Sequence, residues 1–231
     1  MLDLTNSVRV SRELECPILK IVREAVVNTA IELLDEVGLE GLTMRKLAAA
    51  LDVRAPSLYW HFPSKEALLD GMTEALLAPV GRNLADGLPW EEKLWRIAVE
   101  LRSVLVSRRD ASRVFAGTYV LGSNTLRVGS LMHSCLQDAG FEHRRASWGV
   151  FTLTHFIAGF AIEEQAFRNR PTDNTHLSLA DTELLANYPL GAQLVAEITI
   201  ESADERFAFG FNTHLAGWKN MLCDCSVPHR A

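Results

Sequence analysis

The 231-residue sequence predicts an all-α fold in two parts. Apolar residues recur at steps of three and four along most of the chain, which is the period of an amphipathic helix. The stretches between these runs hold Pro, Gly, Ser, Thr and Asp, residues that begin or end helices. One β-branched stretch, residues 194–200, is ambiguous between helix and strand, but a lone strand would have no partner. The predicted helices cover residues 17–37, 44–51, 56–62, 65–77, 89–107, 124–139, 143–168 and 203–222.

Each element of the N-terminal part is delimited by residues that begin or end helices. A hydroxyl at an N-cap accepts a hydrogen bond from a free backbone N–H, and proline in the first turn removes no hydrogen bond. Glycine just past a helix can take a positive φ. In chain order, these signals are Gly38, Thr43, Pro56, Ser64, Pro79 and Gly81. We therefore expect an N-terminal arm over residues 1–17 and a compact four-helix domain over residues 18–80.

The two long helices of the C-terminal part carry more apolar surface than the others. The helix over residues 143–168 is apolar on more than one side, which is more than one domain core easily covers. The last helix is aromatic along one stripe, and its Gly210 and Gly217 would let another helix approach closely. This pattern favours pairing with a second copy, with burial inside the chain as the alternative. The expected segments are 81–223 for the helical domain, 169–180 for its loop and 224–231 for a tail.

Composition restricts the class of protein. With 48% hydrophobic and 23% charged residues, the chain has the profile of a soluble globular protein. Its net charge of −6 argues against a broadly basic, non-specific nucleic-acid binder. The N-terminus has no apolar signal region, and the most apolar stretch, residues 149–162, is too short to span a bilayer. The four cysteines are too few and scattered for a disulfide framework. We expect a cytoplasmic protein with no membrane partner.

Two short predicted helices have the spacing of a helix-turn-helix. Residues 43–51 and 55–62 are separated by only three residues. In such a motif the second helix presents its N-terminal residues to base edges in the major groove. Residues 43–65 carry four basic side chains against Asp52 alone, a net charge of +3 within an acidic chain. A surface that binds DNA phosphates needs such a local positive charge.

The same segment resembles the TetR family of bacterial repressors. Leu42-Thr43-Met44-Arg45-Lys46-Leu47-Ala48 and Pro56-Ser57-Leu58-Tyr59-Trp60-His61-Phe62 carry the resemblance, together with residues 65–70. A weaker similarity to the tetracycline-repressor-like branch continues through residues 114–118, 154–156 and 209–211. The resemblance implies a DNA-binding domain followed by a ligand-binding and dimerisation domain. The alternative for this segment is a bundle corner whose aromatic side chains simply pack.

The resemblance assigns roles within the motif. Arg45, Pro56 and Ser57 match positions that face bases, and an arginine can read a guanine with two hydrogen bonds. For Trp60, packing and DNA contact remain equally open. Arg9 and Arg12 lie in an arm that either follows the DNA backbone or minor groove or makes no contact. The residues that match phosphate-binding positions or add positive charge are Thr43, Lys46, Arg54, Tyr59, Trp60, His61 and Lys65.

The resemblance also implies partners and a mechanism. The expected partners are double-stranded operator DNA, a small-molecule inducer and a second copy of the chain, joined through a four-helix bundle of helices 143–168 and 203–222. The two DNA-binding domains would sit about 34 Å apart on a two-fold operator. Helix 65–77 joins the DNA-binding domain to the ligand site. A ligand would favour a dimer whose recognition helices no longer match the half-sites.

The expected ligand pocket is mostly apolar. Tetracycline-binding members of the family place a magnesium-ligating histidine where Phe115 stands here. Positions that match their other polar contacts read Gly81, Ile97 and Leu101, which cannot hydrogen-bond through a side chain. We therefore expect no metal, no cofactor and an inducer other than magnesium–tetracycline. The candidate pocket residues, each of which could instead be plain core, are Ile97, Leu101, Phe115, Thr118, Tyr119, Leu121, Asn124, Phe151, His155 and Phe156.

Other functional classes have weaker support. The sequence has no glycine-rich phosphate loop, nucleophile elbow or HExxH motif, so we do not expect an enzyme. Cys223, Cys225 and His229 could supply three zinc ligands, but their spacing is not that of a common structural site, and a reduced tail is the simpler interpretation. We expect a repressor. The alternatives are an activator with the same fold and a ligand-binding dimer with weak DNA affinity.

Overall fold

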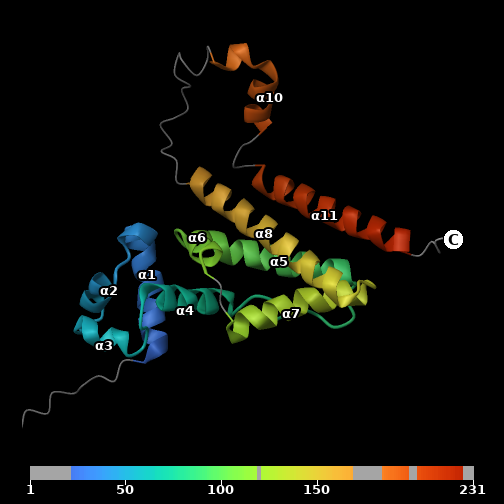
Figure 1. The fold of residues 1–231 in the computed structure, drawn as a ribbon. Helices are drawn as coiled ribbons and strands as arrows, with labels where there is room; N and C mark the ends of the chain where they lie inside the picture. The colour runs from blue at the N-terminus through green and yellow to red at the C-terminus, as the bar shows by residue number, and fades with distance from the viewer. Residues whose placement is uncertain (1–21, 119–120, 169–183, 198–201, 226–231) are drawn as a thin grey trace, which may run out of the picture.

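A computed structural model of the chain describes residues 22–118, 121–168, 184–197 and 202–225 (Figure 1). These ranges contain helices and no strand, which confirms the all-α prediction. The predicted arm, the loop at 169–180, Tyr119 and His229 lie outside the described residues. The helices are α1 (Arg23–Gly41), α2 (Met44–Ala50), α3 (Ala55–Tyr59), α4 (Lys65–Leu77), α5 (Trp90–Val106), α6 (Ala111–Ala116), α7 (Ser123–Asp138), α8 (His143–Arg168), α10 (Pro189–Glu197) and α11 (Ala203–Cys225).

The predicted caps of the N-terminal helices are present. Thr43 Oγ1 accepts a hydrogen bond from the Lys46 backbone N–H, and Ser64 Oγ accepts one from the Ala67 N–H, each at 3.2 Å. Gly38 has a φ of 68°, the left-handed conformation that kinks α1 near its end. Helices α1 to α4 close over one apolar core, which includes Val26, Ala30, Leu34, Leu47, Leu58, Phe62, Leu68 and Met72.

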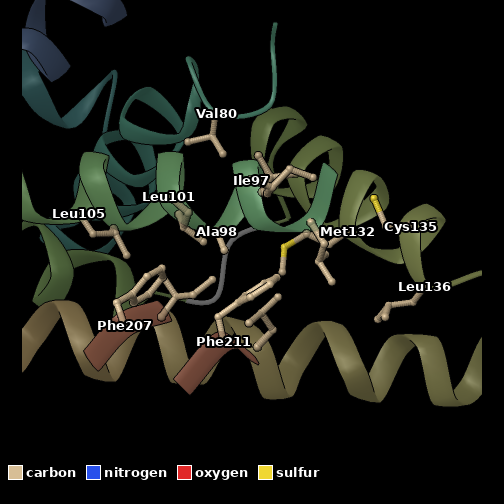
Figure 2. Close-up of a cluster of buried hydrophobic side chains, with 14 of the residues drawn as sticks. Val80, Ile97, Ala98, Leu101, Leu105, Met132, Cys135, Leu136, Phe207 and Phe211 are labelled. Atoms are coloured by element: carbon tan, nitrogen blue, oxygen red, sulfur yellow. The ribbon is translucent and has the colours of Figure 1, made fainter. Parts of the chain in front are cut away.

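Helices α5 to α8 and α11 pack around a second core. Helix α8 contacts α5, α6, α7 and α11, and α11 lies along it (Figure 1). Figure 2 shows Phe207 and Phe211 of α11 reaching across to α5, where both are buried. At Gly210 an added Cβ would lie 2.4 Å from the Phe156 ring of α8. The close approach predicted at this glycine therefore occurs within the chain, whereas an added Cβ at Gly217 would meet nothing within 4 Å.

Two elements differ from the sequence expectation. Helix α6 was not predicted, because its start is marked by Asp110 in the left-handed region, at φ 56°, rather than by glycine or proline. Part of the stretch that was ambiguous between helix and strand, up to residue 197, belongs to α10, a helix. Within the described ranges, no helix is long and apolar enough to cross a membrane.

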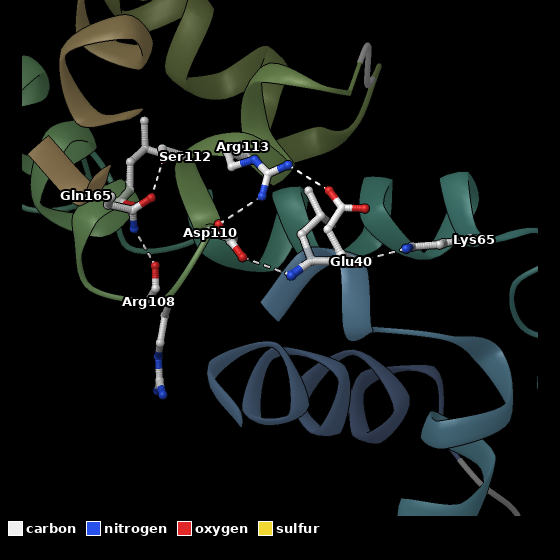
Figure 3. A network of polar contacts seen from close by, with 9 residues as sticks. Glu40, Lys65, Arg108, Asp110, Ser112, Arg113 and Gln165 are labelled. Carbon is white, nitrogen blue, oxygen red and sulfur yellow. Dashed lines mark hydrogen bonds and ion pairs between the residues drawn. The ribbon is translucent and has the colours of Figure 1, made fainter. Parts of the chain in front are cut away.

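The two domains are joined by polar contacts between the end of α1 and the turn before α6 (Figure 3). Asp110 Oδ2 accepts the Leu39 backbone N–H at 2.9 Å, and Arg108 donates to Asp35 at 2.7 Å. From α8, the buried Gln165 amide donates to the Arg108 carbonyl. One short turn is therefore bonded both to the N-terminal domain and to the centre of the C-terminal domain.

Candidate DNA-binding surface and ligand cavity

Helices α2 and α3 present a polar, basic surface. Leu47 of α2 and Leu58 of α3 are fully buried and hold the two helices together. The opposite faces are exposed, because the buried positions recur with the helical period. The predicted DNA-binding residues that are exposed here are Thr43, Arg45, Lys46, Arg54, Pro56, Ser57, Tyr59 and Trp60.

The aromatic pair at the end of α3 is turned outward. Trp60 is 91% exposed and Tyr59 is 49% exposed. A side chain as exposed as Trp60 contributes little to a core, so the structure does not support the packing interpretation of this residue. A large apolar side chain held in water beside basic residues is suited to contact with a partner.

His61 and Lys65 are half-buried and take part in holding the motif. Lys65 Nζ donates to the Leu39 carbonyl at 3.0 Å, which ties the start of α4 to the end of α1. Arg23 donates to the His61 carbonyl at 2.6 Å and places its guanidinium 4.1 Å from the centre of the Phe62 ring. No local pattern indicated this role for Arg23, because its partners lie 38 residues or more along the chain.

Helix α4 leads from this surface to α7. Glu74 of α4 lies at the N-terminus of α7. The Glu74 carboxylate accepts the backbone N–H groups of Asn124 and Thr125, each at 2.8 Å. Burial alone would raise the pKa of Glu74, but hydrogen bonds from Thr125, Asn124 and Ser123 outweigh burial and lower that pKa below its ordinary value. An ionised carboxylate thus caps α7, where the helix dipole also favours negative charge.

Helix α7 caps α4 in return. Arg127 of α7 donates to the carbonyls of Leu77 and Ala78, at 3.0 and 3.2 Å, and to that of Val80. Leu77 is the last residue of α4, and Ala78 and Val80 follow directly, so Arg127 binds carbonyls at the end of the helix, where the helical hydrogen-bond pattern stops. The two helices therefore satisfy each other's ends, and we expect α4 to move together with α7.

A cavity of about 350 Å³ lies between α4, α6, α7 and α8, with one wall residue from α5. Its volume is within the range of small-molecule sites. Of the predicted pocket residues, it is lined by Leu101, Phe115, Thr118, Leu121, Phe151 and His155. The wall residues that the sequence did not indicate are Thr73, Leu77, Ala116, Thr125, Leu126, Val128, Gly129, Met132, Val150, Thr154 and Ala158.

Three predicted pocket residues lie elsewhere among the described residues. Ile97 is fully buried in the core, one turn of α5 before Leu101 (Figure 2). The Asn124 side chain bonds to the Glu74 carbonyl at 2.9 Å, so it joins α7 to α4. Phe156 stacks on Phe207 of α11, with ring centres 5.4 Å apart. The helical period indicates which face of each helix is apolar. It does not indicate which neighbouring helix that face contacts.

The cavity wall does not fit a magnesium ion. Its described polar side chains are threonine hydroxyls and His155, and none is a carboxylate. Magnesium prefers an octahedral set of oxygen ligands that usually includes carboxylate. Across the described part of the chain, no three His, Cys, Asp or Glu side chains come together as a metal site would require.

A second hollow, of about 740 Å³, lies between α1 and α4. It is an open groove whose lining includes Arg23, Glu24 and Asp70. Small-molecule sites are mostly apolar and enclose most of their ligand. The smaller cavity is therefore the better candidate for a ligand site.

Two family models match the chain, and together they span most of it. The model of bacterial regulatory proteins of the tetR family matches residues 26–72, which cover α2, α3 and most of α1 and α4. The model of the tetracyclin repressor-like C-terminal domain matches residues 85–222, which include most of the cavity wall.

Individual relatives agree with these matches. The tetracycline repressor protein class C of Escherichia coli is 39% identical over 87% of this chain and 92% of its own length. A possible TetR family transcriptional regulator from Streptomyces coelicolor A3(2) has a solved structure that is 35% identical, covering 87% of this chain and 100% of that one, with a TM-score of 0.73. The Streptomyces coelicolor protein ActR in complex with actinorhodin is 26% identical, covering 87% and 98%, with a TM-score of 0.73. The chain therefore belongs to the TetR family of bacterial regulatory proteins.

Proposed function

We propose that the chain is a cytoplasmic, homodimeric transcriptional repressor that a small, largely apolar ligand releases from its operator. The observation that carries this proposal is the continuity of α4. Its first turn is bonded to the end of α1 beside the exposed α2–α3 surface, and its last turns supply Thr73 and Leu77 to the cavity wall. A ligand that displaces this helix changes the position of the DNA-binding surface.

The residues that contact DNA in this proposal follow the sequence assignment. Arg45, Pro56 and Ser57 would read base edges, and the surrounding residues would bind phosphate. The exposure of Trp60 and Tyr59 supports this assignment, since side chains on that face are available to a partner. Lys65 would contribute charge while it also holds Leu39.

The dimer in this proposal forms through the outer faces of α8 and α11. Trp148 of α8 is 57% exposed, and Phe209 of α11 is 76% exposed. Further along α11, Gly217 leaves room for a close helix contact. Large apolar side chains gathered on neighbouring helices are typical of a surface that a partner covers. A second copy would place two DNA-binding domains on a two-fold operator.

Repression is preferred to activation only by the names of the relatives, because the same DNA contacts serve either outcome. The tetracycline repressors that the chain resembles are repressors by name. A ligand-binding dimer with weak DNA affinity is disfavoured by the exposed basic surface of α2 and α3.

Replacing Arg45 with alanine should weaken binding to the operator by about 1–3 kcal/mol, because a bidentate contact to a base is lost. The measurement is fluorescence anisotropy at fixed salt with DNA from upstream of the chain's own gene. Arg96→Ala is the matched control, since Arg96 is an exposed arginine on α5 whose only ion pair within the described ranges is with Glu92. Unchanged DNA binding by an Arg45→Ala, Tyr59→Ala double variant would show that the groove assignment is wrong.

Tetracycline should not stabilise the protein in a magnesium-dependent manner. The cavity offers one imidazole and no carboxylate among its described residues, so a magnesium–tetracycline chelate would lose its usual ligands. A thermal-shift measurement with tetracycline, with and without Mg²⁺, checks this expectation. A rise of several degrees in Tm that disappears on chelation of Mg²⁺ would overturn the exclusion, because ligands raise Tm by mass action.

A further inference from the structure

On one side of the cavity, the threonine hydroxyl protons are already used in hydrogen bonds within the protein. Thr118 Oγ1 donates to the Phe115 carbonyl at 3.0 Å. A carbonyl can only accept, so the Thr118 proton points toward it. The hydrogen bond of 2.9 Å between Thr73 and Thr118 must then use the Thr73 proton. Both hydroxyls line the cavity, yet neither has a proton left for a ligand.

The Thr125 hydroxyl proton is also used within the protein, so this hydroxyl too can only accept a hydrogen bond from a ligand. Its hydroxyl donates to Glu74 Oε1 at 2.5 Å, and an ionised carboxylate can only accept. Glu74 is held ionised by this bond and by the N–H groups of α7. These three hydroxyls, on α4, on α7 and just after α6, thus present oxygen lone pairs but no protons, with a negative charge directly behind Thr125.

The opposite wall, on α8, has a different character. Among the described residues, the Thr154 hydroxyl and the His155 ring nitrogens make no hydrogen bond, and His155 is only stacked beside Phe151. These groups are free to donate or to accept. Selection by hydrogen-bond direction therefore comes from the threonine wall and not from α8.

We propose that this cavity selects uncharged, largely apolar ligands that present a hydrogen-bond donor, such as a phenolic or alcoholic hydroxyl, to Thr73, Thr118 and Thr125. The inference rests on the proposed function, because it treats the cavity as the ligand site. An ether or carbonyl oxygen in the same place would face oxygen lone pairs with no proton between them. A carboxylate there would additionally face the charge of Glu74 across Thr125.

Three probes of nearly equal size separate these cases: naphth-2-ol, 2-methoxynaphthalene and 2-naphthoate. Binding to the full-length protein is measured by isothermal titration calorimetry. We expect naphth-2-ol to bind about tenfold more tightly than 2-methoxynaphthalene, the ratio that one net hydrogen bond supplies. We expect 2-naphthoate to bind most weakly. Equal affinity of naphth-2-ol and either other probe, or no binding of naphth-2-ol, would overturn the inference.

Variants locate the source of the preference. In a Thr118→Val, Thr125→Val double variant the tenfold preference should fall below about twofold, because the acceptor oxygens are gone. The matched Thr118→Ser, Thr125→Ser variant keeps both oxygens and should keep the preference. Thr29→Val is the control, because Thr29 lies on α1, a helix that supplies no residue to the cavity wall. A preference that survives in the valine variant would refute the assignment to these threonines.

The operator-binding assay separates the two proposals. A protein that binds its upstream DNA but shows no preference for naphth-2-ol retains the proposed function and loses this inference. A protein that prefers naphth-2-ol but binds no DNA keeps the ligand class and loses the function as a repressor. Should the valine variant fail to fold, the ranking of the three probes on the unsubstituted protein still decides.

Discussion

Replacing Glu164 with alanine is expected to lower the free energy of unfolding by about 3–5 kcal/mol, because it removes the buried carboxylate that pairs with Arg102 and leaves that guanidinium with the exposed Asp204. Glu164 of α8 is buried, with a side chain only 1% exposed. It accepts hydrogen bonds from Arg102 of α5 at 2.8 and 3.1 Å, and from Arg168 at 2.5 Å. Arg102 cannot readily lose its proton, so the variant would retain a cation among apolar side chains.

Asp204 provides the matched control for this prediction. It contacts the same guanidinium, at 2.7 Å from Arg102 Nη1, but its side chain is 92% exposed. Exposed ion pairs contribute about 0–1 kcal/mol, so Asp204→Asn should change stability little. Urea unfolding at one fixed protein concentration measures both, since a dimer's stability depends on concentration. A similar decrease in the free energy of unfolding for the two variants would mean that burial does not determine how much each carboxylate stabilises Arg102.

Local signals predicted the N-terminal domain well. The caps at Thr43 and Ser64, and the positive φ at Gly38, each depend on a residue type and its neighbours within four positions. Such information is fully present in the sequence. The exposed face of α2 and α3 follows from the same helical period, so its residues could be identified without tertiary contacts. His61 and Lys65 were the exceptions, because both are half-buried by contacts with α1.

The cavity could be predicted only in part, because it depends on how helices distant in the sequence meet. Phe115 and Thr118 were indicated by a family motif, whereas Thr73 of α4 gave no sign that it would lie beside α6, 45 residues away. Phe156 was expected in the cavity, but Gly210 gives its ring a site against α11 instead. Likewise, nothing local pairs Arg102 with Glu164, 62 residues apart.

Gly129→Leu should abolish ligand binding while it leaves DNA binding intact. Gly129 of α7 lines the cavity, and a Cβ added there would meet no atom within 4 Å, so a leucine side chain has room to enter the cavity and fill part of it. We expect naphthalene, which needs only volume and an apolar wall, to bind at least about 100-fold more weakly, a loss of about 2.7 kcal/mol. Stability should rise by about 0.5–1 kcal/mol, because glycine is a poor helix former.

The neighbouring Ser130→Leu variant separates cavity filling from a general effect on α7. Ser130 is exposed on the same helix, so its leucine would project into solvent. Calorimetry should show ordinary naphthalene affinity for Ser130→Leu and the loss of at least about 100-fold for Gly129→Leu, with both proteins binding upstream DNA as the unsubstituted chain does. The opposite outcome is weaker DNA binding by Gly129→Leu. It would mean that the leucine side chain displaces α4 as a ligand does, through the contacts of Arg127 and Glu74 that join α7 to α4. The DNA affinity of Gly129→Leu therefore shows whether filling the cavity is enough for release or whether release requires the hydrogen bonds that only a ligand makes.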